Sequence, residues 1–395
     1  MLSLVVAGET IEPHCGLGNY LECLAAALKD TRPKEVGALI VRKTSVKRHS
    51  VLRQMLKSVL SMRACRSLSC FRRSLLATRW AAEWALLPAD AVCLLPFIAF
   101  ADDGELDRYY ELLCNRPLVL VIHDLHPFYY PEHFTFCPSA PERLRTRLQL
   151  LIPRAQQIVT HNQFTKNDIC NRFPAANGKC RVALLPALFD PGKLDAQGGR
   201  LDDMTQLGIR PPYALWASSG TLVHKNHDRL IASWRQLLNE SYDIQLVCTG
   251  TKEPRWDEIR KSIVATGLQN RVLFTGVVTN RDLMADIVRG ATLAVCPTLY
   301  EGGGSGPAAE SVLAEVPVCC SRIPQTEEQF AGLDGVNWFD PYSVCDITRC
   351  VREVLDDYPK AKSRAVSAAR EYRHLRSWPS VARVYWDAVL ASMPT

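Results

Sequence analysis

Short apolar segments alternate with helical stretches along most of the chain, and they fall into two series. Near-continuous apolar segments are typical of parallel strands that helices cover on both faces. The first series occupies residues 3–7, 36–41, 91–96, 118–123, 157–160 and 182–186, and the second occupies 213–217, 244–249, 272–276, 293–296, 318–321 and 338–339. This pattern predicts an α/β fold with two Rossmann-like, doubly wound parallel-sheet domains.

The region 195–212, rich in Gly, Asp and Pro, is the natural linker between the two series. A chain of 395 residues is also too long for one comfortable hydrophobic core. We therefore predict a first domain over residues 1–195 and a second over 196–378. Ligands of doubly wound sheets bind at the carboxyl ends of the strands, so we expect the binding region in a crevice between the domains.

Composition fits an ordinary globular protein, with 47% hydrophobic and 22% charged residues. The longest apolar run, about residues 92–101, is far shorter than the ~20 residues of a membrane-spanning helix. The apolar residues 2–7 follow no basic segment, so we expect no signal peptide and a cytoplasmic location. The chain has 15 cysteines, an odd number without paired Cys-x2-Cys spacing, which favours reduced thiols over disulfides or a zinc site.

The segment from Pro297 to Glu310 carries the most informative residues. It reads Pro-Thr-Leu-Tyr-Glu-Gly-Gly-Gly-Ser-Gly-Pro-Ala-Ala-Glu, between an apolar segment and a helical stretch at 308–314. Consecutive glycines let backbone N–H groups converge, and a helix N-terminus adds about half a positive charge, so this turn suits a phosphate-bearing ligand. Glu310, expected in the first helical turn, is placed to hydrogen-bond a sugar diol, and Glu301 is placed beside the reacting group.

This segment resembles the nucleotide-sugar site of the retaining GT-B glycosyltransferases of family four, whose pattern is Pro-Ser-x-x-Glu-Gly-Phe-Gly-x-Pro-x-x-Glu with a later Pro-Val. Pro317 and Val318 stand at the family's distance after the second glutamate. The resemblance implies donor-binding roles for Gly302, Gly303, Gly304, Ser305 and Glu310, and a catalytic role for Glu301. One departure is that eight residues separate the two glutamates, one more than in the family.

Two segments of the first series extend the resemblance. Gly16 and Gly18 follow the first strand and open a helix, like the family's N-terminal glycine loop; the alternative is a plain strand-to-helix turn. The sequence Val-Ile-His-Asp-Leu-His-Pro at 121–127 resembles the family's His-Asp-Leu-x-Pro segment. In the family this histidine contacts the donor sugar, so the resemblance gives His123 a catalytic role, whereas a lone histidine after a strand is usually a core residue.

The second series contributes two further segments. Residues 219–227 resemble the family's Gly-Thr-x-x-x-x-Lys-Asn segment, in which the lysine neutralises the donor diphosphate, a role that passes to Lys225. Many relatives add an arginine five or six residues earlier, where this chain has Ser219 and Gly220, so His224 or backbone amides are the expected substitutes. Residues 276–280 resemble the nucleobase-binding turn, which implies that backbone groups near Val278 pair with the base.

Near the end, residues 377–385 resemble the family's terminal helix, which crosses back to the first domain. The resemblance therefore predicts a GT-B fold with two Rossmann-like domains facing across a cleft, in which 1–195, joined by 379–395, bind the acceptor. The region 196–378 then binds the nucleotide-sugar. The acceptor hydroxyl attacks from the face of the departing diphosphate, while Glu301 and His123 stabilise the oxocarbenium-like sugar.

We expect no divalent metal and no other cofactor. No Asp-x-Asp pair occurs anywhere in the sequence, and metal-dependent transferases of the other common fold use that pair to hold an ion on the diphosphate. A lysine and a helix N-terminus hold the diphosphate instead.

The interval 42–79 contains 11 basic residues and no acidic one. Apolar residues recur within it at helical spacing, which indicates a basic amphipathic helix on an anionic membrane surface. The alternative is a core-facing helix with a solvated basic face. Nucleic acid is not an expected partner, because aromatic interleaving and a recognised motif are both missing.

The sequence thus favours a retaining hexosyltransferase of the mannosyltransferase-like group that uses a nucleotide-sugar donor and a glycan or lipid-linked glycan acceptor. Its expected setting is cell-surface polysaccharide or lipopolysaccharide synthesis, at the inner face of the membrane. Two alternatives remain open: a sugar-nucleotide epimerase of the same fold, and a catalytically inactive scaffold that binds nucleotide-sugar or glycan.

Overall fold

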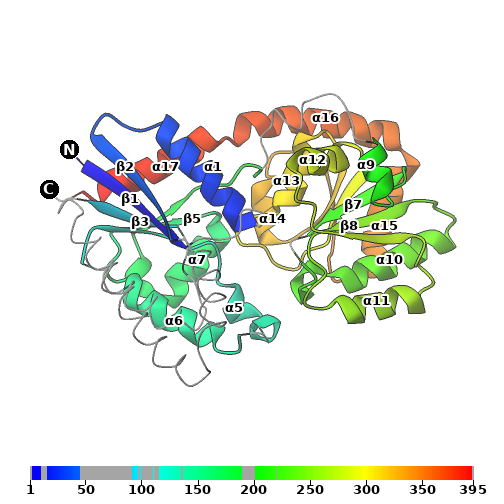
Figure 1. Ribbon diagram of the computed structural model, residues 1–395, viewed down its shortest axis with the longest axis horizontal. Coiled ribbons are helices and arrows are strands. Elements are labelled where there is room, and N and C mark those ends of the chain that lie inside the picture. Colours follow the sequence, from blue (N-terminus) through cyan, green and yellow to red (C-terminus); the bar gives the residue numbers. More distant parts are fainter. Residues whose placement is uncertain are drawn as a thin grey trace, which may run out of the picture. The chain divides into compact units, whose positions relative to one another are not determined.

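Contacts between Cα atoms divide the chain into two compact units (Figure 1). The computed structural model describes residues 2–9, 16–44, 91–96, 98, 110, 115–134, 137–188, 201–218 and 220–393. Unit 1 comprises Met1–Pro13, Leu21–Ala183 and Pro379–Thr395, and unit 2 comprises His14–Tyr20 and Leu184–Trp378. The predicted domain boundary at residue 195 and the basic stretch 45–79 lie outside the described residues.

Unit 1 is built on a parallel sheet of six strands in the order β2-β1-β3-β4-β5-β6. The strands are β1 (Leu2–Glu9), β2 (Val36–Thr44), β3 (Val92–Leu95), β4 (Leu118–Val121), β5 (Gln157–Thr160) and β6 (Cys180–Val182). Every side chain of β3 and β4 is buried, as expected for central strands with both faces covered.

Helices connect the strands of unit 1 and complete its core. They are α1 (Gly16–Asp30), α5 (His126–Tyr129), α6 (Ala140–Leu151), α7 (Gln163–Arg172) and α17 (Trp378–Ala391), with short 3-10 turns η1 (Pro131–Phe134) and η2 (Pro174–Ala176). The terminal helix α17 is tied to the N-terminal part of the chain, because the indole Nε1 of Trp386 donates a hydrogen bond to Thr31 Oγ1 at 3.1 Å.

Unit 2 contains a second parallel six-stranded sheet, in the order β12-β11-β10-β7-β8-β9. Its strands are β7 (Tyr213–Ala217), β8 (Gln245–Thr249), β9 (Val272–Gly276), β10 (Leu293–Cys296), β11 (Val318–Ser321) and β12 (Val336–Phe339). The chain runs outward from β7 through β8 to β9 and then returns to β10 on the other side of β7. The strand order therefore reverses between β7 and β10, and at such a point ligands of doubly wound sheets bind.

Helices lie on both faces of this second sheet (Figure 1). The helices are α9 (Leu201–Gln206), α10 (His227–Asn239), α11 (Trp256–Ala265), α12 (Arg281–Arg289), α13 (Gly306–Leu313), α14 (Pro324–Gln329), α15 (Val344–Asp356) and α16 (Tyr358–Leu375). On one face α10 contacts α11 and α15, and on the other α12 contacts α9 and α13.

Side-chain caps explain where several helices begin. In each case a short polar side chain accepts a hydrogen bond from a backbone N–H of the first helical turn, which would otherwise lack an intrahelical partner. The capping residues are Asn162 for α7, Asn280 for α12, Ser305 for α13, Ser343 for α15 and Asp357 for α16.

The structure confirms the α/β class with two doubly wound parallel sheets. One detail differs from the sequence-based expectation. The last strand of unit 1 ends at Val182 and not in the apolar stretch up to residue 186, because its pairing with β5 ends where Thr160 meets Val182. Among the described residues, no helix is long and apolar enough to cross a membrane.

Candidate functional site

Two loops converge at the carboxyl ends of β7 and β10, the point where the strand order of unit 2 reverses. The first loop follows Ala217 and contains the short turn η3 (Val223–Lys225). The second follows Cys296 and contains Glu301 and the glycine turn. Because β7 and β10 are hydrogen-bonded neighbours, the sheet itself brings together segments that are about 75 residues apart in the sequence.

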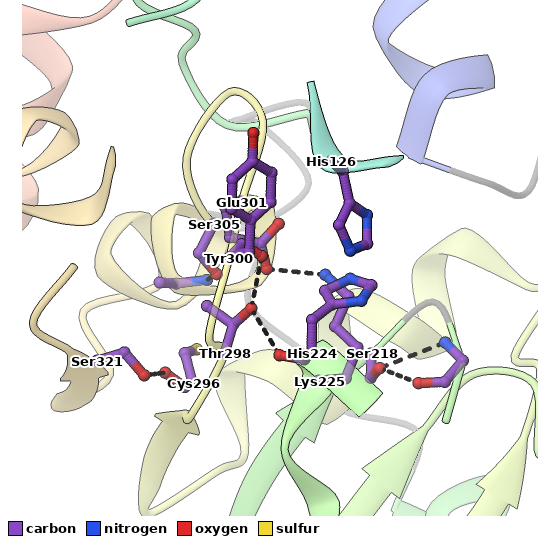
Figure 2. A network of polar contacts seen from close by, with 12 residues as sticks. His126, Ser218, His224, Lys225, Cys296, Thr298, Tyr300, Glu301, Ser305 and Ser321 are labelled. Atoms are coloured by element: carbon purple, nitrogen blue, oxygen red, sulfur yellow. Dashed lines mark hydrogen bonds and ion pairs between the residues drawn. The ribbon is translucent and has the colours of Figure 1, made fainter. Parts of the chain in front are cut away.

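An ion pair links these loops: Lys225 Nζ lies 2.8 Å from Glu301 Oε1 (Figure 2). The lysine side chain is 11% exposed and the glutamate side chain 13%. A pair shielded from water to this extent is electrostatically stronger than a surface pair, and removing one partner leaves the other charge uncompensated. Two residues that the sequence assigned to one site therefore do contact each other.

Asn226 fixes the position of the lysine loop. It is buried, with a φ of 58° in the left-handed region that asparagine tolerates better than most residues. Its Nδ2 donates to the carbonyl oxygens of Pro297 at 2.9 Å and Pro341 at 2.8 Å. Asparagine is suited to this task because its amide supplies two donors.

Thr298 ties the two loops together a second time. Its Oγ1 lies 2.9 Å from the carbonyl oxygen of Tyr300 and 3.3 Å from that of His224, and Leu299 N–H donates to the same His224 carbonyl at 2.7 Å (Figure 2). The backbone of His224 thus serves to hold the glycine loop. The His224 side chain and nearby backbone amides stay the predicted substitutes for the missing arginine in binding the diphosphate. Ser219 lies outside the described residues.

The glycine turn leads directly into α13. Gly302 and Gly303 are half-buried, Gly304 has a φ of +91°, and Ser305 is fully buried. The Oγ of Ser305 caps the helix by accepting from Ala308 N–H at 3.4 Å. The helix N-terminus therefore lies at the carboxyl end of β10, in the position expected for binding an anion.

Glu310 lies two residues deeper in α13 than the sequence suggested. The helix begins at Gly306, because the Ser305 cap and Pro307 start it before residue 308, so Glu310 falls in the second turn and not the first. Its side chain is buried, and burial raises its pKa to about 8. A carboxyl group in this environment is largely protonated at neutral pH, and in that form it can both donate and accept a hydrogen bond.

His123 follows β4 in unit 1. Its Nε2 lies 2.8 Å from the Pro96 carbonyl oxygen, and its ring centroid lies 4.7 Å from that of His161. Since a carbonyl can only accept, Nε2 carries the proton and Nδ1 is the acceptor nitrogen. Burial lowers the pKa of His123 to about 4, so the imidazole is neutral at physiological pH.

The remaining predicted residues lie where the motifs placed them. Gly16 and Gly18 open α1, and Gly18 is buried. Val278 lies in the turn between β9 and α12, partly buried against the core of unit 2. The binding roles of these residues stay predictions.

Sequence reasoning missed Asn226, Thr298 and Gln329 as residues that shape the site. Asn226 and Thr298 both stand inside the two motifs given above, and that position is the available signal. Gln329 bonds to backbone groups of another loop, and no local pattern reveals a contact of that kind.

Comparison with known proteins relates the chain to characterised sequences. The family model described as glycosyl transferases group 1 matches residues 200–372, which include both loops of unit 2. The chain is 24% identical over 213 residues to the O-antigen chain mannosyltransferase RfbU of Salmonella typhimurium, covering 54% of each chain. It is 22% identical over 292 residues to the 2-deoxystreptamine glucosyltransferase of Streptomyces kanamyceticus, covering 73% of this chain and 69% of the relative.

The match to the first of these relatives spans only about half of its length. Among solved structures, HepE from Anabaena in complex with UDP and glucose superposes with a TM-score of 0.68 at 16% identity, covering 98% of each chain. A likeness at this identity establishes a common fold.

Proposed function

We propose that this chain, whose residues 200–372 match the glycosyl transferases group 1 model and which has the GT-B fold, is a retaining glycosyltransferase. It moves a hexose from a nucleotide-diphosphate sugar to a hydroxyl of a glycan or lipid-linked glycan. The observation that carries the proposal is the juxtaposition of Lys225, Glu301 and the N-terminus of α13 at the switch point of the second sheet.

The donor diphosphate binds between Lys225 and the N-terminus of α13. Lysine supplies a compact positive charge on a flexible stem, and the first-turn N–H groups of the helix supply fixed partial charges. Glu301 is the partner of Lys225 at 2.8 Å, so the lysine charge lies between the diphosphate and the carboxylate beside the sugar.

Charge separation in the transition state explains the different roles of Lys225 and Glu301. As the bond to the diphosphate breaks, negative charge grows on the leaving group beside Lys225, and positive charge grows at the anomeric carbon beside Glu301. The neutral imidazole of His123 offers the acceptor atom Nδ1 to the same sugar. The acceptor hydroxyl attacks from the face of the leaving diphosphate, whose oxygen receives the hydroxyl proton, so the anomeric configuration is retained.

Glu310 binds the ribose of the donor. A buried carboxyl with a pKa near 8 is suited to a diol, because the protonated form pairs as donor with one hydroxyl and as acceptor with the other. Backbone groups around Val278 pair with the nucleobase. This assignment needs no divalent metal and no other cofactor.

Cell-surface polysaccharide or lipopolysaccharide synthesis is the proposed setting, supported by the O-antigen chain mannosyltransferase among the relatives. A glycan or lipid-linked glycan is therefore the acceptor. The basic residues 42–79 would place the enzyme on an anionic membrane surface.

Thermal stabilisation by nucleotide-sugars tests the proposal. Purified protein is heated with UDP-, GDP- or dTDP-sugars, since a ligand at 100 times its dissociation constant adds ~2.7 kcal/mol of stability. The nucleotide-sugars of one base are expected to stabilise the wild-type protein but not the Lys225→Ala protein. Hydrolysis of that donor then separates an enzyme from an inactive scaffold. Stabilisation by none of the three bases contradicts the proposal, and stabilisation without hydrolysis or transfer favours the scaffold.

A further inference from the structure

Gln329, the last residue of α14, binds the glycine turn through both atoms of its side-chain amide. Its Oε1 accepts from the backbone N–H of Ser305 at 2.7 Å, and its Nε2 donates to the backbone carbonyl of Ser305 at 3.1 Å. Gln329 and Ser305 are both buried. One amide therefore satisfies both polar groups of a buried backbone unit, which would otherwise be costly to leave without partners.

The neighbouring glycine is shaped by the same side chain. Gly304 has a φ of +91°, and a Cβ atom on it would lie 2.5 Å from Gln329 Oε1 and 2.6 Å from Gln329 Cδ. Such distances are far below van der Waals contact, so a side chain at position 304 would require the Gln329 amide to shift. The turn that contains the additional residue between the two glutamates thus packs closely against Gln329.

Gln329 is itself held in place by α16 and by Arg376, the residue that follows this helix. Arg376 Nη2 donates to the backbone carbonyls of Glu328 at 3.3 Å and Gln329 at 3.2 Å. Tyr372, a buried residue of α16, packs against Phe330, the residue after Gln329, with ring centroids 5.8 Å apart. A side chain fixed from behind in this way can impose one conformation on the loop in front of it.

We propose that Gln329 is a positioning residue that sets donor affinity by holding residues 302–306 in the conformation that receives the diphosphate. This inference rests on the proposed function for the identity of the ligand. Gln329 acts through Ser305: with the Ser305 N–H directed at Gln329, the turn is fixed in the shape that leads into the N-terminus of α13. Without the amide the turn samples other conformations. Donor binding then has to order the turn, and this cost lowers donor affinity.

Hydrogen exchange tests the positioning step without any nucleotide. Gln329→Met keeps the length of the side chain and removes both hydrogen bonds. Gln325→Met is the matched control, because Gln325 is buried on the same helix but is not among the described side chains that bond Ser305. Peptides covering 300–308 are expected to exchange at least about tenfold faster in Gln329→Met and to be unchanged in the control. Unchanged exchange in Gln329→Met overturns the proposal.

Steady-state kinetics tests the functional step, with whichever UDP-, GDP- or dTDP-sugar stabilises the wild type. Gln329→Met is expected to raise the donor KM about tenfold while kcat stays within about twofold, since the ground state and the transition state lose the same ordering. A purely structural role would lower the fraction of active protein, and therefore kcat, without changing KM. That result overturns the proposal, whereas an absence of nucleotide binding by the wild type contradicts the proposed function itself.

Gln329→Glu provides a second variant should Gln329→Met fold poorly. A protonated glutamate has the shape of glutamine and can accept from the Ser305 N–H while donating to the Ser305 carbonyl, but an ionised glutamate cannot donate. Donor affinity of this variant, relative to wild type at each pH, is expected to approach wild type in acid and to fall about tenfold as pH rises. A constant ratio across pH overturns the proposal.

Discussion

At the residue scale, the Lys225–Glu301 pair is the feature on which the site depends. The pair neutralises two charges that are each nearly nine-tenths shielded from solvent. Under the proposed function, the diphosphate and Glu301 interact with the same ammonium group. Both members of the pair are therefore sensitive to substitution, and for different reasons.

Lys225→Ala should lower turnover by one or more orders of magnitude, at ~1.4 kcal/mol per decade, because the leaving diphosphate loses a positive charge as its own negative charge grows. The measurement is kcat and kcat/KM of donor hydrolysis or transfer. Lys261→Ala, an exposed lysine in α11 of the same unit, is the control and should behave as wild type. Near-normal turnover of a folded Lys225→Ala protein would remove Lys225 from the site.

The two glutamates should respond differently to substitution. Glu310→Ala should raise the donor KM more than it lowers kcat, because it removes a ribose contact that exists in both the ground state and the transition state. Glu301→Gln should lower kcat with little change in KM, because its charge matters chiefly when the sugar becomes positive. Steady-state kinetics over a range of donor concentrations separates these effects, with exposed Glu327→Gln as control. A Glu301→Gln protein with both constants unchanged would favour the binding-scaffold alternative.

Burial of Glu310 should also make stability depend on pH. Its pKa is raised to about 8 in the folded protein, so between about pH 4.5 and 8 the folded state binds a proton that the unfolded state has lost, and stability falls as pH rises. Glu310→Gln removes this loss of stability, because glutamine does not ionise. We expect it to gain about 1 kcal/mol or more relative to wild type across that window in urea unfolding, since one pKa unit is about 1.4 kcal/mol. A pH-independent difference between the two proteins would contradict the raised pKa.

At the element scale, the cap and glycine turn of α13 determine where the site residues lie. The sequence located β5, β7, β10 and β11 to the residue, because an apolar strand between two parallel neighbours has a clear start and end in hydrophobicity. It also located β9, the edge strand of the second sheet, to the residue. It placed the start of α13 two residues late, because the helix start depends on the Ser305 cap and not on apolar periodicity. That difference of two residues moved Glu310 from the first turn of the helix into the second.

Gly304→Ala tests how strictly this turn requires glycine. The substitution places a side chain at a φ of +91° and against Gln329, so it should cost about 2–4 kcal/mol of unfolding free energy, combining backbone strain with overpacking. Gly332→Ala is the matched control, since Gly332 has a φ of +86° with nothing within 4 Å of the added Cβ. It should cost only about 1–2 kcal/mol. Equal losses in chemical denaturation would show that Gln329 yields to the added methyl group.

At the scale of the whole molecule, two parallel sheets of six strands provide the framework, and in the second sheet the reversal of strand order locates the site. The loops after β7 and β10 lie beside each other because those strands are neighbours. Neither loop alone contains a positive charge, a carboxylate and a helix N-terminus together. These three features come together because the sheet topology makes β7 and β10 neighbours.

Catalysis should be independent of divalent metal. The sequence contains no Asp-x-Asp pair to hold an ion on the diphosphate, and Lys225 with the α13 N-terminus provides the positive potential instead. Sugar transfer measured in excess EDTA should therefore equal transfer in its absence. Loss of activity that Mg²⁺ or Mn²⁺ restores would contradict the proposed mechanism.

The sequence by itself determined the α/β class, most strand positions and the two loops that carry the candidate chemistry. It did so because strand hydrophobicity, glycine turns and helix starts are local properties, readable over a few residues. Only the tertiary structure decided that Lys225 pairs with Glu301, that Glu310 is buried enough to raise its pKa, and that Gln329 holds Ser305. Each of these depends on the desolvation and distance of groups far apart in the chain, which are set when strands of different sequence position become neighbours in one sheet.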